Sequence, residues 1–242
     1  LPAPAGTRRS DAPGLGPAAL ARKKLVADVG AAFAGLALLG FLQNVDVIVL
    51  GRLDHANVGP YAAISVASKA MVFGALALGA YLLPEATIRW NEGGHAVRQL
   101  GVTLIFLAVP AIVLLALSVV APRRFLSVVF GARLSGGAPA LATLVLAMVF
   151  LSVTVLLTNY LFGTGSRWIV AVLAVGSVAA AGLVAAAGGR ILQTARADLA
   201  VQAGLLAAML VAFVAVHVRH RGEPWLPAPV RRRWVRPGAS PP

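Results

Sequence analysis

The chain has 242 residues, of which 59% are apolar and only 12% are charged, and its mean hydropathy is +0.86. Soluble domains carry roughly twice that charged share, so this composition excludes a soluble globular domain and predicts a membrane protein. The 21 basic residues outnumber the 8 acidic ones, but most flank apolar runs, where topology and lipid headgroups explain them, and we expect no nucleic-acid partner.

Six apolar segments predict the architecture. Residues 1–28 are basic and rich in Pro, Gly and Ala, and we interpret them as a cytoplasmic linker. The next part, residues 29–218, holds six segments that are each near the ~20 residues a helix needs to cross a bilayer. The predicted spans are about 29–50, 60–83, 100–121, 139–162, 168–188 and 199–218. Residues 219–242 predict a basic, disordered cytoplasmic tail. The fold class is therefore all-α, a polytopic membrane protein with six transmembrane helices.

The charges of the connections predict an orientation. Fourteen of the 21 basic residues lie at the chain ends and in the loops on the same side, whereas six lie in the opposite loops. Because cytoplasmic loops are enriched in Lys and Arg, both ends of the chain are predicted to be cytoplasmic.

The connection between the third and fourth spans has a pattern of its own. Residues 123–134 (RRFLSVVFGARL) place apolar side chains between basic ends. This pattern predicts a short helix lying in the outer headgroup region, in contact with membrane lipid. An alternative is that these residues only extend the third span.

The first two spans carry polar residues at a depth where hydrocarbon is expected. Asn44 and Asp46 lie in the first span, whereas Tyr61, Ser65 and Lys69 lie in the second. The spacing of the second set, i, i+4 and i+8, puts these side chains on one face of a helix. A charge near the bilayer centre costs at least a few kcal/mol. These polar groups are therefore expected to face protein or a wet cavity.

Lys69 and Asp46 have two interpretations. Lys69 could hold an anionic substrate group, such as a phosphate, in a central cavity, or it could form a structural pair with Asp46. Asp46 is the only carboxylate within the predicted spans, and it could also bind a proton or couple to a cation. Arg52, at the outer mouth of the same hairpin, is either an interface anchor or a further ligand.

A second polar patch lies near the inner end of the fourth span. Asn159 and Tyr160 either face the cavity or bond to a neighbouring helix. His55 and His95 lie in loops that are far apart in the predicted topology, and cysteine is absent, so no metal site is expected. No nucleophile elbow or phosphate-binding loop is present either. We therefore expect neither an enzyme nor a cofactor.

The order of these motifs resembles one known family. NVDVIVLG is followed by a short loop, then by VGPYAAISVASKAMVF and a span that ends in LLPE. Further along, FLSVVFGARLSGGAPALATLVLAMVF and NYLFGTGSRW keep the same order. Together these stretches resemble the polysaccharide exporters, or oligosaccharide flippases, of the multidrug/oligosaccharidyl-lipid/polysaccharide transporter superfamily. Asp46, Gly59, Tyr61 and Lys69 fall at places where this family carries such residues.

The resemblance implies a fold, a substrate and a partner. Members of the family have two six-helix lobes that face each other across a cavity, so this chain would be the C-terminal lobe and would need a second six-helix lobe. The implied function is to flip a polyprenyl-pyrophosphate-linked oligosaccharide across the bacterial cytoplasmic membrane for surface polysaccharide synthesis. Lys69 and Arg52 would hold the pyrophosphate, and Asn44, Asp46 and Asn159 would line the path of the sugars.

Two other functions remain open. One is a cation-coupled drug antiporter of the same superfamily, which requires a carboxylate that binds and releases the coupling ion. The other is a membrane scaffold that does not transport but binds a glycosyltransferase or polymerase. In the scaffold, Lys69 and Asp46 would be a structural pair, and replacing both by neutral residues should be tolerated.

Overall fold

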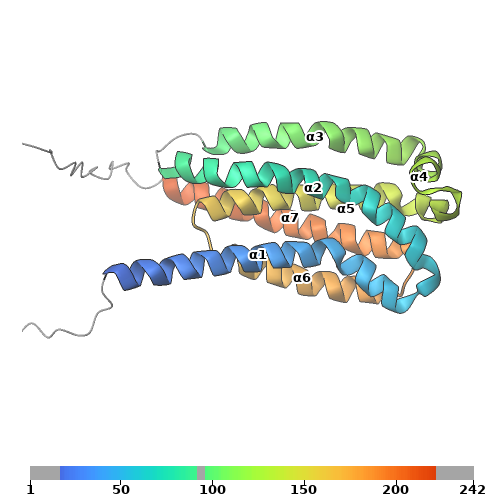
Figure 1. The fold of residues 1–242 in the computed structure, drawn as a ribbon, viewed down its shortest axis with the longest axis horizontal. Helices are drawn as coiled ribbons and strands as arrows, with labels where there is room; N and C mark the ends of the chain where they lie inside the picture. The colour runs from blue at the N-terminus through green and yellow to red at the C-terminus, as the bar shows by residue number, and fades with distance from the viewer. Residues whose placement is uncertain (1–16, 92–95, 222–242) are drawn as a thin grey trace, which may run out of the picture.

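The computed structural model describes residues 17–91 and 96–221, and within these ranges it contains helices and no strand (Figure 1). In chain order the elements are α1 (Pro17–Leu53), α2 (His55–Asn91), α3 (Ala96–Val120), α4 (Pro122–Phe130), the 3₁₀ helix η1 (Ala132–Gly137), α5 (Ala138–Gly163), α6 (Ile169–Ala186) and α7 (Ile191–Arg221).

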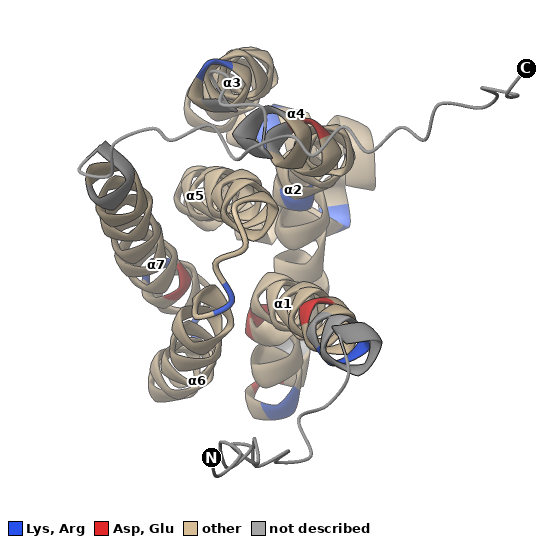
Figure 2. Ribbon diagram, turned by 90° about the vertical axis from the view of Figure 1, so that its left-hand side faces the viewer, with Lys and Arg blue, Asp and Glu red and all other residues tan. Residues whose placement is uncertain are grey.

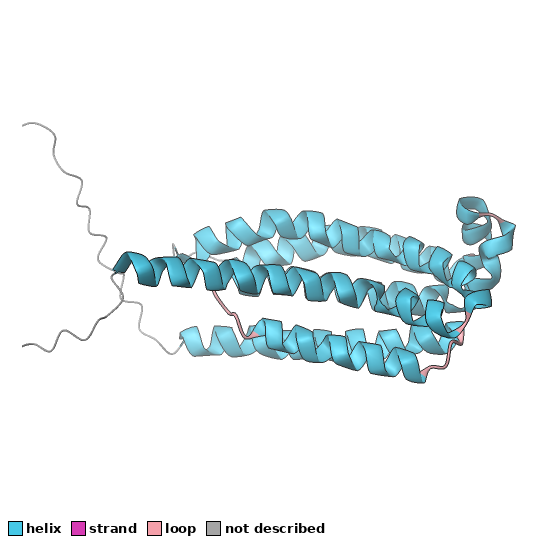
Figure 3. Cartoon of the chain, turned by 60° about the horizontal axis from the view of Figure 1, so that its bottom comes forward, coloured by secondary structure: helices cyan, strands magenta, loops and turns pink. Residues whose placement is uncertain are grey.

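Six of these helices, α1 to α3 and α5 to α7, are long and apolar enough to cross a membrane. The predicted all-α fold with six spans is therefore confirmed. The connections between α1 and α2, α5 and α6, and α6 and α7 are short, and the described chain is almost entirely helical (Figure 3).

Several helices begin earlier than the predicted spans, and α1 and α7 do so by the most residues. α1 starts at Pro17, inside the segment predicted as a linker, and α7 starts at Ile191 rather than near residue 199. Proline suits the first turn of a helix, and the Ala, Leu, Arg and Lys residues that follow favour helix, so α1 extends beyond its apolar stretch. Residues 1–16 of the predicted linker and 222–242 of the predicted tail lie outside the described residues.

The segment between the third and fourth spans forms separate helices. α3 ends at Val120, and Pro122 opens α4, which is followed by η1. The residue before a proline disfavours helical geometry, which explains the break at Ala121. The prediction of a short separate helix is confirmed, and the alternative of an extended third span is wrong. Its position in the headgroup region stays a prediction.

α5 is the central helix of the bundle. It packs against α2, α7 and α3, whereas α1 packs mainly against α6 and α2 (Figure 2). Two thirds of the most apolar window of α5 is buried within the protein, against about a fifth for α1 and α3. The outward faces of the other helices are strongly apolar, as Phe33, Ile105 and Val178 show with exposures of 75%, 68% and 75%. Such faces suit contact with lipid or with another membrane-embedded protein.

Candidate site between the first, second and last helices

A cluster of polar side chains joins α1, α2 and α7 inside the bundle. Asp46 of α1 and Asp198 of α7 are both 0% exposed, and Lys69 of α2 is 8% exposed. Lys69 interacts electrostatically with both carboxylates, and each carboxylate interacts with the other. Tyr61 of α2 is fully buried and Gln202 of α7 is too. We call these five residues the buried polar cluster.

Each helix contributes hydrogen bonds to the cluster. The Tyr61 hydroxyl donates to Oδ2 of Asp46 at 2.9 Å, and Nε2 of Gln202 donates to Oδ1 of Asp198 at 3.2 Å. The second bond joins residues four apart on α7, which places both side chains on one face of that helix. These bonds hold the carboxylates in position while leaving part of each one free.

The Lys69 ammonium is bound at the edge of the cluster. Its Nζ donates to Oδ1 of Asn44 at 3.0 Å, and Nδ2 of Asn44 donates to the carbonyl of Gly40 at 2.8 Å. Asn44 is itself exposed on the surface of the bundle. The Asn44 side chain therefore lies between the ammonium and any molecule that covers this part of α1 and α2.

Three buried acceptors in the cluster have no hydrogen-bond partner among residues 17–91 and 96–221. They are Oδ1 of Asp46, Oδ2 of Asp198 and Oε1 of Gln202. Buried polar groups are paired in most proteins, and leaving one unpaired costs roughly 1–3 kcal/mol. The cluster thus has unused capacity to accept a proton, a cation or a hydrogen-bond donor.

The charges of the cluster do not balance within the protein. Two carboxylates face one ammonium, so one negative charge has no counterpart when all three groups are ionised. Charges inside a membrane span are rare, and they commonly mark the path of a substrate or an ion. A second cation, or a proton bound to one carboxylate, would neutralise the remaining negative charge.

Asp198 and Gln202 were not among the residues predicted from the sequence. The prediction that Asp46 is the only carboxylate within the spans is wrong, because α7 begins at Ile191 and Asp198 lies inside the candidate span Ile191–Val218. The hydropathy at the start of this helix is lowered by Arg190, Arg196 and Asp198. The predicted start of the span therefore lies too far toward the C-terminus. The i, i+4 spacing of Asp198 and Gln202 was the available signal.

The other predicted site residues divide between the cluster and the rest of the bundle. Ser65 lies on α2 between Tyr61 and Lys69, is 1% exposed, and its hydroxyl has no hydrogen-bond partner in the part of the chain that the structure describes. Its position agrees with the predicted polar face. Arg52 is exposed near the end of α1 and forms no hydrogen bond or ion pair with the cluster among the described residues. Its role as a ligand stays a prediction.

Asn159 forms a hydrogen bond within its own helix α5 and packs against α2, whereas Tyr160 contacts α7. Nδ2 of Asn159 donates to the carbonyl of Val155 at 2.9 Å, and its side chain lies against Gly79 of α2. The Tyr160 hydroxyl lies 3.0 Å from Nε2 of His217 on α7. Only the contact of Tyr160 joins two helices by a hydrogen bond. Among the described residues, neither Asn159 nor Tyr160 is hydrogen-bonded to the buried polar cluster, and their place in a substrate path stays a prediction.

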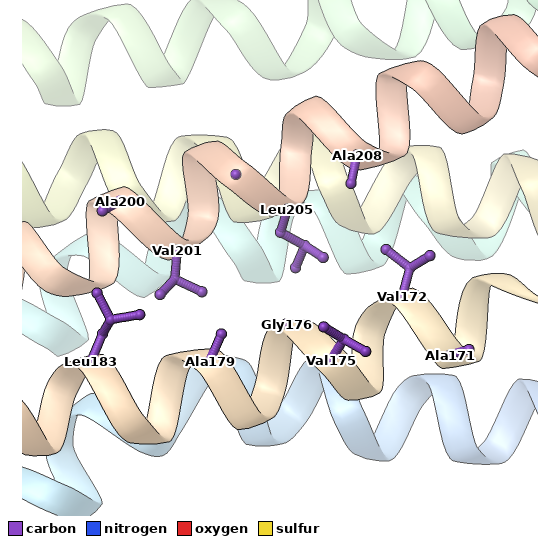
Figure 4. Close-up of a pocket in the computed structure, with 11 residues that line it drawn as sticks. Ala171, Val172, Val175, Gly176, Ala179, Leu183, Ala200, Val201, Leu205 and Ala208 are labelled. Atoms are coloured by element: carbon purple, nitrogen blue, oxygen red, sulfur yellow. The ribbon is translucent and has the colours of Figure 1, made fainter.

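A separate groove runs along the outside of α6 and α7 (Figure 4). It has a volume of about 550 Å³ and is lined only by apolar and glycine residues, among them Val175, Leu183 and Leu205. No charged or hydrogen-bonding side chain lines it, so it lacks the polar groups that give a ligand site its specificity. The buried polar cluster is therefore the stronger candidate site.

Comparisons with known proteins add no assignment. No protein-family model, no curated protein and no solved structure matches the chain. The functional argument consequently rests on the fold and on the chemistry of the buried polar cluster.

Proposed function

We propose that this chain is one six-helix half of a transporter that flips a polyprenyl-pyrophosphate-linked oligosaccharide across the bacterial cytoplasmic membrane, with both chain ends in the cytoplasm. One observation carries the proposal: Lys69, inside a membrane span, interacts with two buried carboxylates and is bound to Asn44, which is exposed. The nature of the substrate comes from the motif resemblance around Asp46, Tyr61 and Lys69.

In this proposal Lys69 is the ligand of the substrate's pyrophosphate. A phosphate oxygen replaces the amide oxygen of Asn44 as acceptor, and a charge-assisted bond of this kind is stronger than the neutral acceptor it replaces. Arg52 provides a second cation at the mouth of the α1–α2 hairpin. Asn44, Ser65 and Asn159 offer hydrogen-bonding groups to the sugars once the helices have separated.

The lipid tail of such a substrate does not need to enter the protein. It can stay in the bilayer while the polar head passes between two lobes, a rocking motion known as alternating access. The second lobe, either on another chain or as a second copy of this one, would cover the exposed surface of α1 and α2 near Asn44. Phe41 and Val66, which are 40% and 58% exposed, give this surface the apolar character that such an interface needs.

Replacing Lys69 tests the proposal. In a bacterium that depends on this protein for surface polysaccharide, Lys69→Ala should abolish export, whereas Lys69→Arg should retain part of it because the charge remains. The matched control is Lys23→Ala, which removes an exposed lysine near the start of α1. Export is measured as surface polysaccharide per unit of protein in the membrane. Unchanged export in Lys69→Ala at normal protein levels would show that the site is wrongly assigned.

The second buried carboxylate favours one alternative, a cation-coupled antiporter. Asp46 and Asp198 each keep one oxygen without a hydrogen-bond partner, as a site that binds and releases a proton or sodium ion requires. In vesicles, Asp198→Asn should then uncouple transport from the ion gradient while the fold is kept, since an amide can still bond with Gln202. If collapsing both the proton and the sodium gradient leaves transport unchanged, this alternative is excluded.

A further inference from the structure

A second candidate site lies at the end of the bundle opposite the start of α1 and the end of α7, beside α4 (Figure 1). Here a cavity of about 450 Å³ opens between the end of α3, the start of α4 and the start of α5. Its wall includes Arg123 and Arg124 together with the apolar side chains of Val120 and Pro139. The cavity is formed by other helices than the buried polar cluster. The cluster lies on α1, α2 and α7, whereas α4 packs mainly against η1, α5 and α3.

Both arginines are available to a ligand. Arg123 and Arg124 are exposed, and neither guanidinium has a hydrogen-bond or ion-pair partner within residues 17–91 and 96–221. Planar guanidinium groups bind phosphate through paired hydrogen bonds. Arg123 and Arg124 both line the cavity, so a phosphate group placed in it would meet both guanidinium groups.

The surroundings of the cavity are apolar, as a lipid requires. Val120 is 82% exposed and Val119 is 65% exposed at the end of α3, and Val128 of α4 is 85% exposed. Leu126, in contrast, is fully buried and fixes α4 to the bundle. A soluble anion would gain nothing from these exposed side chains, whereas the acyl chains of a lipid can lie along them.

Membrane topology does not account for these charges. With both chain ends in the cytoplasm, as predicted, α4 lies on the outer side, where loops carry fewer basic residues. Three arginines nevertheless occur within this short stretch, at positions 123, 124 and 133. An anionic ligand on this side explains their presence.

We propose that the cavity between α3, α4 and α5 binds the phosphate headgroup of an anionic membrane phospholipid through Arg123 and Arg124. The acyl chains of this lipid lie along the exposed end of α3. The bound lipid fixes α4 at the membrane surface and holds the α3–α5 connection in place. This site is separate from the transport site around Lys69 and shares with the proposed function only the predicted orientation of the chain.

Native mass spectrometry of the purified protein with added lipid tests the proposal. The wild type should bind phosphatidylglycerol in preference to phosphatidylcholine, and Arg123→Gln/Arg124→Gln should lose this preference by about tenfold or more, as expected for losing two charge-assisted bonds. The matched control is Arg190→Gln/Arg196→Gln, which removes the same charge from two exposed arginines in and beside α7. Loss of preference in both double variants, or in neither, would overturn the assignment.

Two further measurements separate the remaining outcomes. If inorganic phosphate displaces phosphatidylglycerol at millimolar concentration, the cavity is a site for a free anion and the lipid proposal is wrong. A photoactivatable phosphatidylglycerol should label peptides from residues 120–139 of the wild type, which requires no variant to fold. Labelling spread evenly over all six spans would contradict the proposal.

Discussion

Two polar contacts, one part-buried and one buried, join helices of this bundle, and they differ in how completely their groups are paired. At one, Tyr160 of α5 meets His217 of α7: the hydroxyl lies 3.0 Å from Nε2, and Nδ1 lies 2.8 Å from the carbonyl of Phe213. The rings of Tyr160 and His217 are stacked, and Phe213 packs against both. At the other, the buried polar cluster leaves acceptors on Asp46, Asp198 and Gln202 without partners.

The difference distinguishes a structural contact from a candidate site. A polar contact that serves only to hold helices has no need of spare acceptors, and the Tyr160–His217 contact has the hydrogen bonds and ring packing expected of one. The buried polar cluster instead keeps buried charge with unused bonding capacity, which costs stability unless another group completes it. Removing groups from each contact should therefore have different consequences.

The largest expected effect is on Lys69. Lys69→Met leaves the buried carboxylates of Asp46 and Asp198 without a nearby cation, and leaving a buried charge uncompensated costs about 3–5 kcal/mol. Adding Asp46→Asn should recover much of this loss, because one buried carboxylate is neutralised as well. Thermal unfolding in detergent measures both variants. If the double variant recovers both stability and export, the scaffold function is favoured; stability recovered without export supports a transport site.

A smaller effect is expected where α2 passes α5 next to the Tyr160 contact. A methyl group added at Gly79 would lie 2.6 Å from Nδ2 of Asn159, so Gly79→Ala forces Asn159 to move. Overpacking of this kind costs about 1–3 kcal/mol. Gly74→Ala on the same helix is the control, since nothing lies within 4 Å of its added methyl group. Equal unfolding temperatures for the two variants would show that α2 and α5 can separate here at no cost.

The smallest effect is expected from Tyr160→Phe, which removes only the hydroxyl that contacts His217. The ring packing with Phe213 remains, and a hydrogen bond between membrane helices contributes roughly 0.6 kcal/mol on average. The unfolding temperature should fall slightly and export should stay at the level of the wild type. A strong loss of export with an unchanged unfolding temperature would show that Tyr160 takes part in transport and is more than a structural contact.

The sequence predicted the parts of this structure that depend on local composition. The six spans follow from their apolar length, and the polar face of Tyr61, Ser65 and Lys69 follows from helical periodicity. The contact of α1 with α7 depends instead on packing between helices that are distant in the chain, so Asp198 could not be placed beside Asp46 by periodicity alone. In the same way, the partner of Tyr160 is 57 residues away in the chain.

The central position of α5 has a consequence for how the chain is assembled in the membrane. α1, α2 and α3 precede α5 in the chain, yet both α2 and α3 pack against it, and the main neighbour of α1 is the still later α6. During synthesis Asp46 therefore enters the bilayer long before Asp198. Its first companions are Tyr61 and Lys69 on the very next helix, so the first hairpin brings its own partners for the carboxylate into the lipid.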